Sequence, residues 1–518
     1  MRGGGACEGY RRGGRGAEVA KVAGPRPGMH ATDARTMLEA VTAHWAWTLA
    51  ALAPGGAGAG PAWAEPLPGL ASAAVLASMA PLAHGFGEGV ALPVPFPLLL
   101  LAAAASLVGL AGLLTSRATS GHPAETRAAG AAPGRGHLAG PATGAASTAA
   151  TVAPEAVAAS RTAMTDAPAT AGAVALRVLG AAITAALLAL ALFGSDDAAR
   201  NPAHRLAFGL LWPLLVPLAA LLGGFARHLS PLRTLSGGLL RVVDPEHAGT
   251  VPPPASWGVW PATAGLVVIA WLELVAPAEP ALLALALLGY LLAQLAATVR
   301  YGPAWLARGE SLEVTADLLG RMSPLRRSHG RLRLADPRAA LAAPLQPGTL
   351  GVVSVLIGAH LFDFVSDSAR WAAVESLREG VALYAVRSAG LLACIAAVAA
   401  AGRLATRGGL LLPAFIPLVL GYGLAHHTPV LLVEGQAGLR QLLEPGIRAV
   451  ADYELLPVTP VATFVLLVFL AGHLLAVRTG HDLAFARYDP RGARAVQLPL
   501  RAVLLLSLLG GLALRFPA

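Results

Sequence analysis

The chain has 518 residues, of which 55% are hydrophobic and only 13% are charged, and its mean hydropathy is +0.62. A soluble core of this size does not need so much apolar sequence, so the composition predicts an all-α, polytopic transmembrane helical bundle that resides in a lipid bilayer. The net charge of +9 comes almost entirely from arginine, and its placement indicates membrane topology rather than nucleic-acid binding. The two cysteines, Cys7 and Cys394, occur in contexts too different to indicate a disulfide framework or a thiolate metal site.

The N-terminal part of the chain differs from the rest. Residues 1–83 are predicted to be a disordered region, rich in Gly and Arg, that ends in a short apolar segment of signal-peptide length. Whether this region is cleaved, or whether the true start is Met37, stays open. Residues 84–116 contain the first transmembrane helix, 117–172 form a disordered Ala/Gly/Pro-rich cytoplasmic linker, and 173–518 form the transmembrane helical domain.

Several apolar stretches are long enough to cross a bilayer. A hydrocarbon core of about 30 Å needs roughly 20 helical residues at about 1.5 Å each. The sequence therefore predicts about ten membrane helices, at 95–115, 173–194, 206–225, 258–276, 280–298, 347–365, 381–402, 409–427, 459–478 and 496–514.

Arginine is unevenly distributed among the connections between these stretches. The connection 299–346 carries eight arginines, and the connection 226–257 carries three. The alternate connections hold more acidic residues and fewer arginines. Since cytoplasmic loops carry the excess of positive charge, we predict that residues 299–346 are cytoplasmic and residues 428–458 extracytoplasmic.

Polar residues gather at the helix ends that this topology places outside. His360, Asp363 and Asp367 are spaced i, i+3, i+7 and share one helix face. The adjacent pair His426 and His427 ends the eighth stretch, where ionisable side chains are costly and tend to mark functional sites. The other members of this predicted outer set are Asp196, Asp197, Asn201, Glu273, Glu434 and Gln436.

Imidazole and carboxylate groups on one face are the groups of a divalent metal site, for Zn, Mn or Cu, or of a general-base site. The candidate ligands are His360, Asp363, His426 and His427. Because two adjacent residues lie about 100° apart on a regular helix, His426 and His427 would both reach one ion only if the helix unwinds before Pro429. We therefore expect one to ligate and the other to hydrogen-bond. The alternative is that all these residues are ordinary polar helix ends at a membrane interface.

Several blocks of the sequence resemble one known family. They are AHGFGEGVALPVP, RNPAHRLAFGLLWPLLVPL, WLARGESLEVTADLLGRMSPL and, most specifically, GTLGVVSVLIGAHLFDF, GYGLAHHTPVLLVEGQ and AGHLLAV. From Ala83 to Phe516, apart from the linker, the chain resembles the bacterial integral-membrane proteins labelled fenitrothion hydrolase. The resemblance implies a membrane-bound organophosphate hydrolase. The adjacent histidines depart from the His-then-aromatic pattern of that family, which favours His426 over His427.

In the first of two open function classes, the protein is a metal-dependent hydrolase of phosphotriesters. A divalent metal held by His426, His360 and Asp363 would activate water, because a bound ion brings the pKa of water towards neutrality. Glu273 or Glu434 would then act as the catalytic base.

In the second class, the protein is a membrane transporter or metal-handling protein. The same polar cluster would form a vestibule for an ion such as copper, with His473 as a deeper relay. The sequence contains no Walker A lysine, no H-E-x-x-H and no G-x-S-x-G, so ATP-driven transport, zincin proteolysis and a classical serine hydrolase lose support. Substrate, metal identity and oligomeric state are not predicted.

Overall fold

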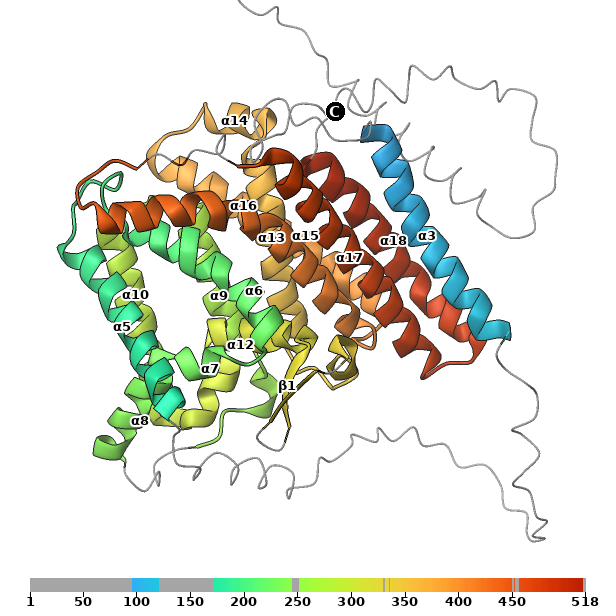
Figure 1. The fold of residues 1–518 in the computed structure, drawn as a ribbon, viewed down its shortest axis with the longest axis horizontal. Coiled ribbons are helices and arrows are strands. Elements are labelled where there is room, and N and C mark those ends of the chain that lie inside the picture. Colours follow the sequence, from blue (N-terminus) through green and yellow to red (C-terminus); the bar gives the residue numbers. More distant parts are fainter. Residues whose placement is uncertain are drawn as a thin grey trace, which may run out of the picture. The chain divides into compact units, whose positions relative to one another are not determined.

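The computed structural model of the chain describes residues 96–120, 171–244, 251–328, 331–334, 336–449, 451 and 456–515. Within this part the chain is almost entirely helical (Figure 1), which confirms the predicted all-α helical bundle. The predictions for residues 1–83 and for most of the linker lie outside the described residues.

Ten helical spans in the described part are long and apolar enough to cross a membrane, as the sequence predicted. In chain order the elements that form them are α3 (Phe96–Ser120), α5 (Ala171–Phe193), the π-helix η2 (Arg205–Leu211) with α6 (Trp212–Leu222), the turn η3 (Ala255–Trp257) with α9 (Trp260–Leu274), α10 (Pro280–Tyr301), α13 (Thr349–Ser366), α15 (Gly380–Thr406), the turn η7 (Leu412–Ala414) with α16 (Phe415–Leu443), α17 (Val458–Phe485) and α18 (Pro490–Arg515).

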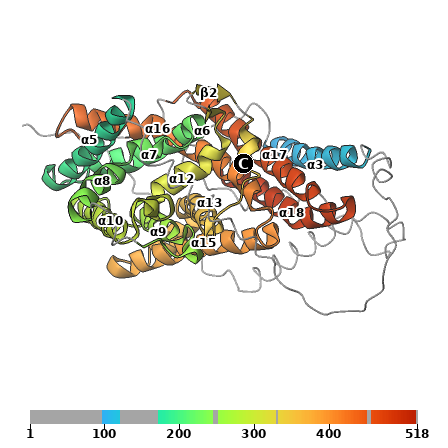
Figure 2. The ribbon, with the colours of Figure 1, turned by 90° about the horizontal axis from the view of Figure 1, so that it is seen from below.

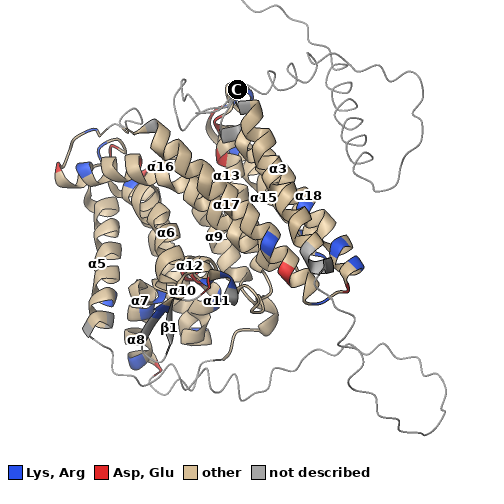
Figure 3. Cartoon of the chain, turned by 45° about the vertical axis from the view of Figure 1, so that its right-hand side comes forward, with Lys and Arg blue, Asp and Glu red and all other residues tan. Residues whose placement is uncertain are grey.

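Shorter elements occupy the connections. Between the third and sixth spans the chain forms α7 (Ala226–Leu229), α8 (Pro231–Val243), η4 (Pro303–Trp305), α11 (Leu306–Gly309), α12 (Ser311–Leu319), η5 (Gly320–Met322) and η6 (Pro337–Ala340), and α14 (Ala369–Glu375) follows the sixth span. One antiparallel hairpin, β1 (Leu325–Ser328) with β2 (Arg331–Leu334), is a small departure from the all-helical prediction. Figure 3 shows basic positions around α7, α8 and β1 and at the turn between α17 and α18. The sidedness of these connections stays a prediction.

Helix α16 is the central element of the packing. It contacts α17, η2, α6 and α13, and α13 in turn packs against α15 and α9. Helix α3 lies beside α17 and α18 although the sequence separates it from them by more than 300 residues (Figures 1 and 2). The helices that carry the two groups of candidate residues, α13 and α16, are therefore direct neighbours.

Two close helix crossings depend on glycine. A Cβ on Gly421 of α16 would lie 2.9 Å from the Val468 carbonyl oxygen and 3.0 Å from the Gly472 Cα of α17. A Cβ on Gly358 of α13 would lie 2.7 Å from the Cα of Ile395 in α15. Since these obstacles are backbone atoms that cannot rotate away, larger residues would push the helices apart. The two crossings fix the positions of α16 and α13 against the rest of the bundle.

Helix α16 corrects one predicted boundary. The eighth stretch was expected to end at residue 427, but α16 continues through Pro429 to Leu443. A proline inside a helix removes one backbone donor and crowds the preceding turn, and here tertiary packing offsets that cost. Beyond the proline, Gly435 and Gly438 allow η2 to pack against the helix. The first part of the segment 428–458 is therefore helix rather than connection.

Candidate functional site

Three histidines from two helices meet inside the bundle. His360 on α13 and His427 on α16 are buried, with 7% and 4% of their surfaces exposed. The ring centroid of His360 lies 4.6 Å from that of His426 and 5.0 Å from that of His427, and the two α16 rings are 5.0 Å apart. One side-chain nitrogen from each of the three rings lies within 4.8 Å of the others. Together they form a group that could hold a metal ion, which we call the three-histidine cluster.

Both adjacent histidines reach this cluster without local unwinding, because α16 is continuous through Pro429. From the sequence, both were expected to reach one ion only if the helix unwound before Pro429, and whether both bind one ion stays a prediction. Their rings nevertheless come close to that of His360 on a continuous helix. The physical reason is the position of His360 on α13. Its ring lies about 5 Å from both, so side chains that leave α16 about 100° apart can converge on a third group placed between their directions.

A hydrogen bond determines which nitrogen His360 can offer to a ligand. Nδ1 of His360 lies 2.5 Å from the carbonyl oxygen of Leu356. Since a carbonyl oxygen only accepts hydrogen bonds, His360 donates its Nδ1 proton there and keeps Nε2 as the potential ligand atom. Nε2 of His426 lies 3.6 Å from Oδ2 of Asp363. Nδ1 of His427 is fully buried and has no hydrogen-bond partner among the described residues.

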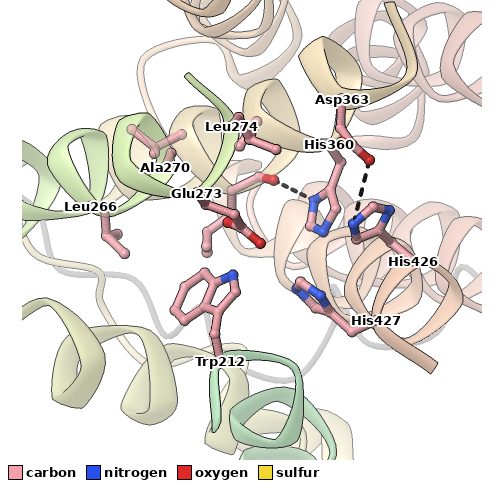
Figure 4. A pocket seen from close by; sticks show the side chains of 12 residues that line it. Trp212, Leu266, Ala270, Glu273, Leu274, His360, Asp363, His426 and His427 are labelled. Atoms are coloured by element: carbon pink, nitrogen blue, oxygen red, sulfur yellow. Dashed lines mark hydrogen bonds and ion pairs between the residues drawn. The ribbon is translucent and has the colours of Figure 1, made fainter. Parts of the chain in front are cut away.

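A small cavity adjoins the cluster (Figure 4). Its polar lining consists of the three histidines, Asp363 and Glu273, and the rest comes from Trp212 and from apolar residues of α9 and α13. The indole nitrogen of Trp212 faces the Glu273 carboxylate. The space open to water-sized molecules is about 20 Å³. This is room for an ion with one or two waters, and far less than a drug-sized ligand needs.

The donor set has a clear chemical preference. Zinc binds imidazole nitrogen at about 2.0–2.1 Å, and three histidines with one open position are the ligands of many catalytic zinc sites. Imidazole suits zinc and copper, whereas manganese favours carboxylate and water oxygens. Among the metals expected from the sequence, three imidazoles with carboxylates set further back fit zinc or copper better than manganese. Asp363 is placed to orient His426, as a carboxylate behind a metal-bound histidine does.

The site lies nearer to one end of α13 than to the other. His360 is twelve residues beyond the N-cap Gly348 and six before the last helical residue, Ser366. At about 1.5 Å per residue these separations are about 18 Å and 9 Å. The cluster is therefore closer to the helix end that the topology prediction places outside.

Glu434, the other carboxylate proposed as a base, does not line the cavity. It accepts a hydrogen bond of 3.0 Å from Nε of Arg205. Arg205 also donates to the carbonyl oxygen of Ala449. The structure thus places Glu434 in an ion pair between η2 and α16, and Glu273 in the cavity.

Other members of the predicted outer set hold local structure together. Asp197 pairs with Arg448 at 2.7 Å, and the hydrogen bond from the Ala199 amide lowers its pKa. The side-chain amide of Asn201 donates to the carbonyl oxygens of Leu190 and Ser195, at 2.9 and 2.8 Å. The Asn201 contacts tie the connection before η2 to the end of α5, and the Asp197 pair ties that connection to the segment after α16. Neither residue lines the cavity.

Trp212 and the π-helix before it were not singled out from the sequence. The π-helix η2 ends at Leu211, and Trp212 opens α6. A π-helical turn inserts an extra residue per turn and so changes the direction of the following side chains. The pair Trp212–Pro213 after a helical stretch was the available signal, but it does not distinguish a π-helix from an ordinary helix.

His473, considered as a deeper relay, lies on α17 outside the cluster. Its Nδ1 is 2.8 Å from the carbonyl oxygen of Phe469, and its Nε2 is 3.0 Å from Oγ of Ser507. Both ring nitrogens therefore have protein partners. This histidine is a matched reference for the cluster, because it is equally buried but hydrogen-bonded on both sides.

The fold and the cluster together define the class: a multi-pass, membrane-type helical protein with a buried three-histidine group. No family model, no curated protein and no solved structure matches the chain. The resemblance to the fenitrothion hydrolase proteins thus stays a prediction.

Proposed function

We propose that this protein is a membrane metal-handling protein that binds one zinc or copper ion with His360, His426 and His427. The observation that carries the proposal is the convergence of three imidazoles in one cavity, where the buried Nδ1 of His427 finds no partner among the described side chains. An unsatisfied buried polar atom is costly, and a metal ion would satisfy it. Asp363 would hold the His426 ring in its binding orientation.

The size of the cavity favours handling of the ion itself. A space of about 20 Å³ accepts an ion with one or two waters. An aryl phosphotriester would need a much larger pocket. We infer that the ion is the cargo, bound on its way into or across the membrane from the extracytoplasmic side.

Metal content of the purified protein tests this proposal. In detergent, the wild type should retain about one zinc or copper ion per chain after dialysis. His360→Gln and His427→Gln should retain at least about tenfold less metal, because loss of one ligand from three removes most of the affinity. The matched control is His473→Gln, which replaces an equally buried histidine outside the cluster and should keep the wild-type content. Equal metal in all four proteins, or none in the wild type after incubation with either ion, would refute the proposal.

A hydrolase is the second candidate, and one observation favours it. Glu273 faces the same cavity as the three histidines without belonging to their group, which is the placement of a base beside a metal site. Glu273 would take the proton of a water molecule that attacks the phosphorus of a phosphotriester. The P–O bond to the aryl group would break, and the aryloxide would leave. The substrate would enter only after α6 moves Trp212 away from the cavity.

Three substitutions separate the candidates. For a hydrolase, Glu273→Gln should lower nitrophenol release from an aryl phosphotriester by about 10²-fold or more at unchanged metal content. Glu434→Gln is the matched control, since this carboxylate pairs with Arg205 outside the cavity. For a metal-handling protein, membranes with the wild type should release no more nitrophenol than empty membranes, and metal uptake into vesicles should depend on His427. Uptake that is unchanged in His427→Gln would exclude the first candidate.

A further inference from the structure

A second group of buried polar atoms lies between α17 and α18, away from the three-histidine cluster. The two helices approach closely where Gly480 faces Leu500, since a Cβ on this glycine would lie 2.4 Å from a methyl carbon of the leucine. His481 follows Gly480 on α17 and Arg501 follows Leu500 on α18, so the two residues lie at the same level of the helix pair. His481 is only 7% exposed.

Both side chains contain a buried nitrogen that has no hydrogen-bond partner among the described residues. One amino group of Arg501 donates to the side-chain oxygen of Gln497 at 3.0 Å. In contrast, Nε of Arg501 and Nδ1 of His481 are fully buried and have no hydrogen-bond partner within the described part of the chain. Because arginine keeps its proton and its Nε is only a donor, the missing group must be an acceptor. An anion satisfies this requirement best.

The carboxylate that follows His481 in the chain is already engaged elsewhere. Asp482 is half-exposed and pairs with Arg478 at 3.0 Å and with Arg338 at 3.4 Å. It therefore does not supply the acceptor that Arg501 lacks. Arg487 follows in the turn between the two helices, and Arg491 and Arg494 lie in the first turns of α18. Figure 3 shows basic positions gathered at this end. The local field thus favours an anionic ligand.

The surroundings of Arg501 indicate that this anion carries hydrocarbon chains. Arg494 precedes Arg501 by seven residues, so the two lie on one face of α18 about 10 Å apart along the axis. Leu498, between them, is 62% exposed, and α18 belongs to a membrane-length span. A headgroup bound at Arg501 would leave acyl chains lying along this exposed apolar face, whereas a free anion would gain nothing from it.

We propose that His481 and Arg501 form a binding site for the phosphate of an anionic phospholipid. Guanidinium binds phosphate oxygens through more than one hydrogen bond, and the arginines at the nearby turn would attract an anionic lipid surface to this end of the protein. The site is independent of the proposed metal function, since neither residue lines the cavity beside the three histidines.

Thermal unfolding of delipidated protein in an uncharged detergent tests the site. Phosphatidylglycerol should raise the Tm of the wild type more than phosphatidylcholine does, and Arg501→Gln should weaken the apparent affinity for phosphatidylglycerol by about tenfold or more. Arg501→Lys should recover part of the effect, because it restores the charge but not the planar fork. Arg403→Gln, which removes an exposed arginine of α15, is the matched control and should respond as the wild type does.

Two further measurements keep the test decisive. His481→Gln should also weaken the response, which covers the case that the Arg501 variant fails to fold. Inorganic phosphate should give no comparable rise in Tm, and a rise equal to that with phosphatidylglycerol would replace the lipid site with a free-anion site. Equal responses to the two lipids, or equal responses of wild type and both variants, would refute the site. Metal content should be the same in all of these proteins, so failure here leaves the metal proposal untouched.

Discussion

Replacement of Asp363 by asparagine is a sensitive probe of the three-histidine cluster, because it keeps all three rings and the shape of the side chain. Asp363 Oδ2 lies 3.6 Å from His426 Nε2, and the carboxylate is 28% exposed. Partners of this kind typically change metal affinity by about 10- to 100-fold. Since the separation exceeds a direct hydrogen bond and water screens the carboxylate in part, we expect the low end of that range. Asp363→Asn should weaken zinc binding about tenfold, or about 1.4 kcal/mol.

Competition with a chromophoric chelator, at constant neutral pH in detergent, measures this change. The matched control is Asp367→Asn, which alters the carboxylate at the C-cap of α13, four residues further on, that does not line the cavity. Its zinc affinity should equal that of the wild type. Unchanged affinity in Asp363→Asn, or the same loss in both variants, would show that Asp363 does not orient a metal ligand.

Two further predictions concern the scaffold. Gly358→Val should destabilise the fold by about 1–3 kcal/mol, because the added Cβ would overlap the backbone of Ile395. Gly289→Ala on α10, where no atom lies within 4 Å of the added Cβ, should be neutral or slightly stabilising. Equal Tm values for the two variants would contradict the close crossing of α13 and α15. The side-chain hydrogen bond from Arg387 lowers the pKa of Glu375, so this pair stabilises the fold above the ordinary pKa of glutamate and loses that contribution as the pH falls through the lowered pKa. The Tm of Glu375→Gln should therefore be below that of the wild type near neutral pH, and the gap should close in acid; a constant gap would refute the assignment.

The membrane helices could be predicted from the sequence because the hydropathy of a stretch is a sum over all of its residues. Each of the ten stretches is a long apolar run, and length alone distinguishes it from a soluble helix. The end of α16 was not predictable in the same way. Pro429 after two histidines is typical of a helix end, but the helix continues because Gly435 and Gly438 pack closely against η2. That contact joins residues more than 200 positions apart, and no local pattern encodes it.

The candidate site, like the fold, was predictable only in part. Spacing along α13 correctly placed His360 and Asp363 on a common face, and both line the cavity with the two α16 histidines. The distinction between Glu273 and Glu434 needed the structure, because only tertiary packing brings Arg205 to Glu434. The direction of Trp212 depends on a π-helical turn that has no sequence signature of its own.

X-ray absorption at the edge of the bound metal tests the central claim most directly. For zinc- or copper-loaded wild type, we predict a first shell that contains about three imidazole nitrogens at roughly 2.0–2.1 Å. His427→Gln, loaded to saturation, should lose one imidazole from that shell, and His473→Gln should leave the shell unchanged. A shell of oxygen ligands alone, or one whose imidazole count does not depend on His427, would contradict the assignment of the three histidines as the metal site.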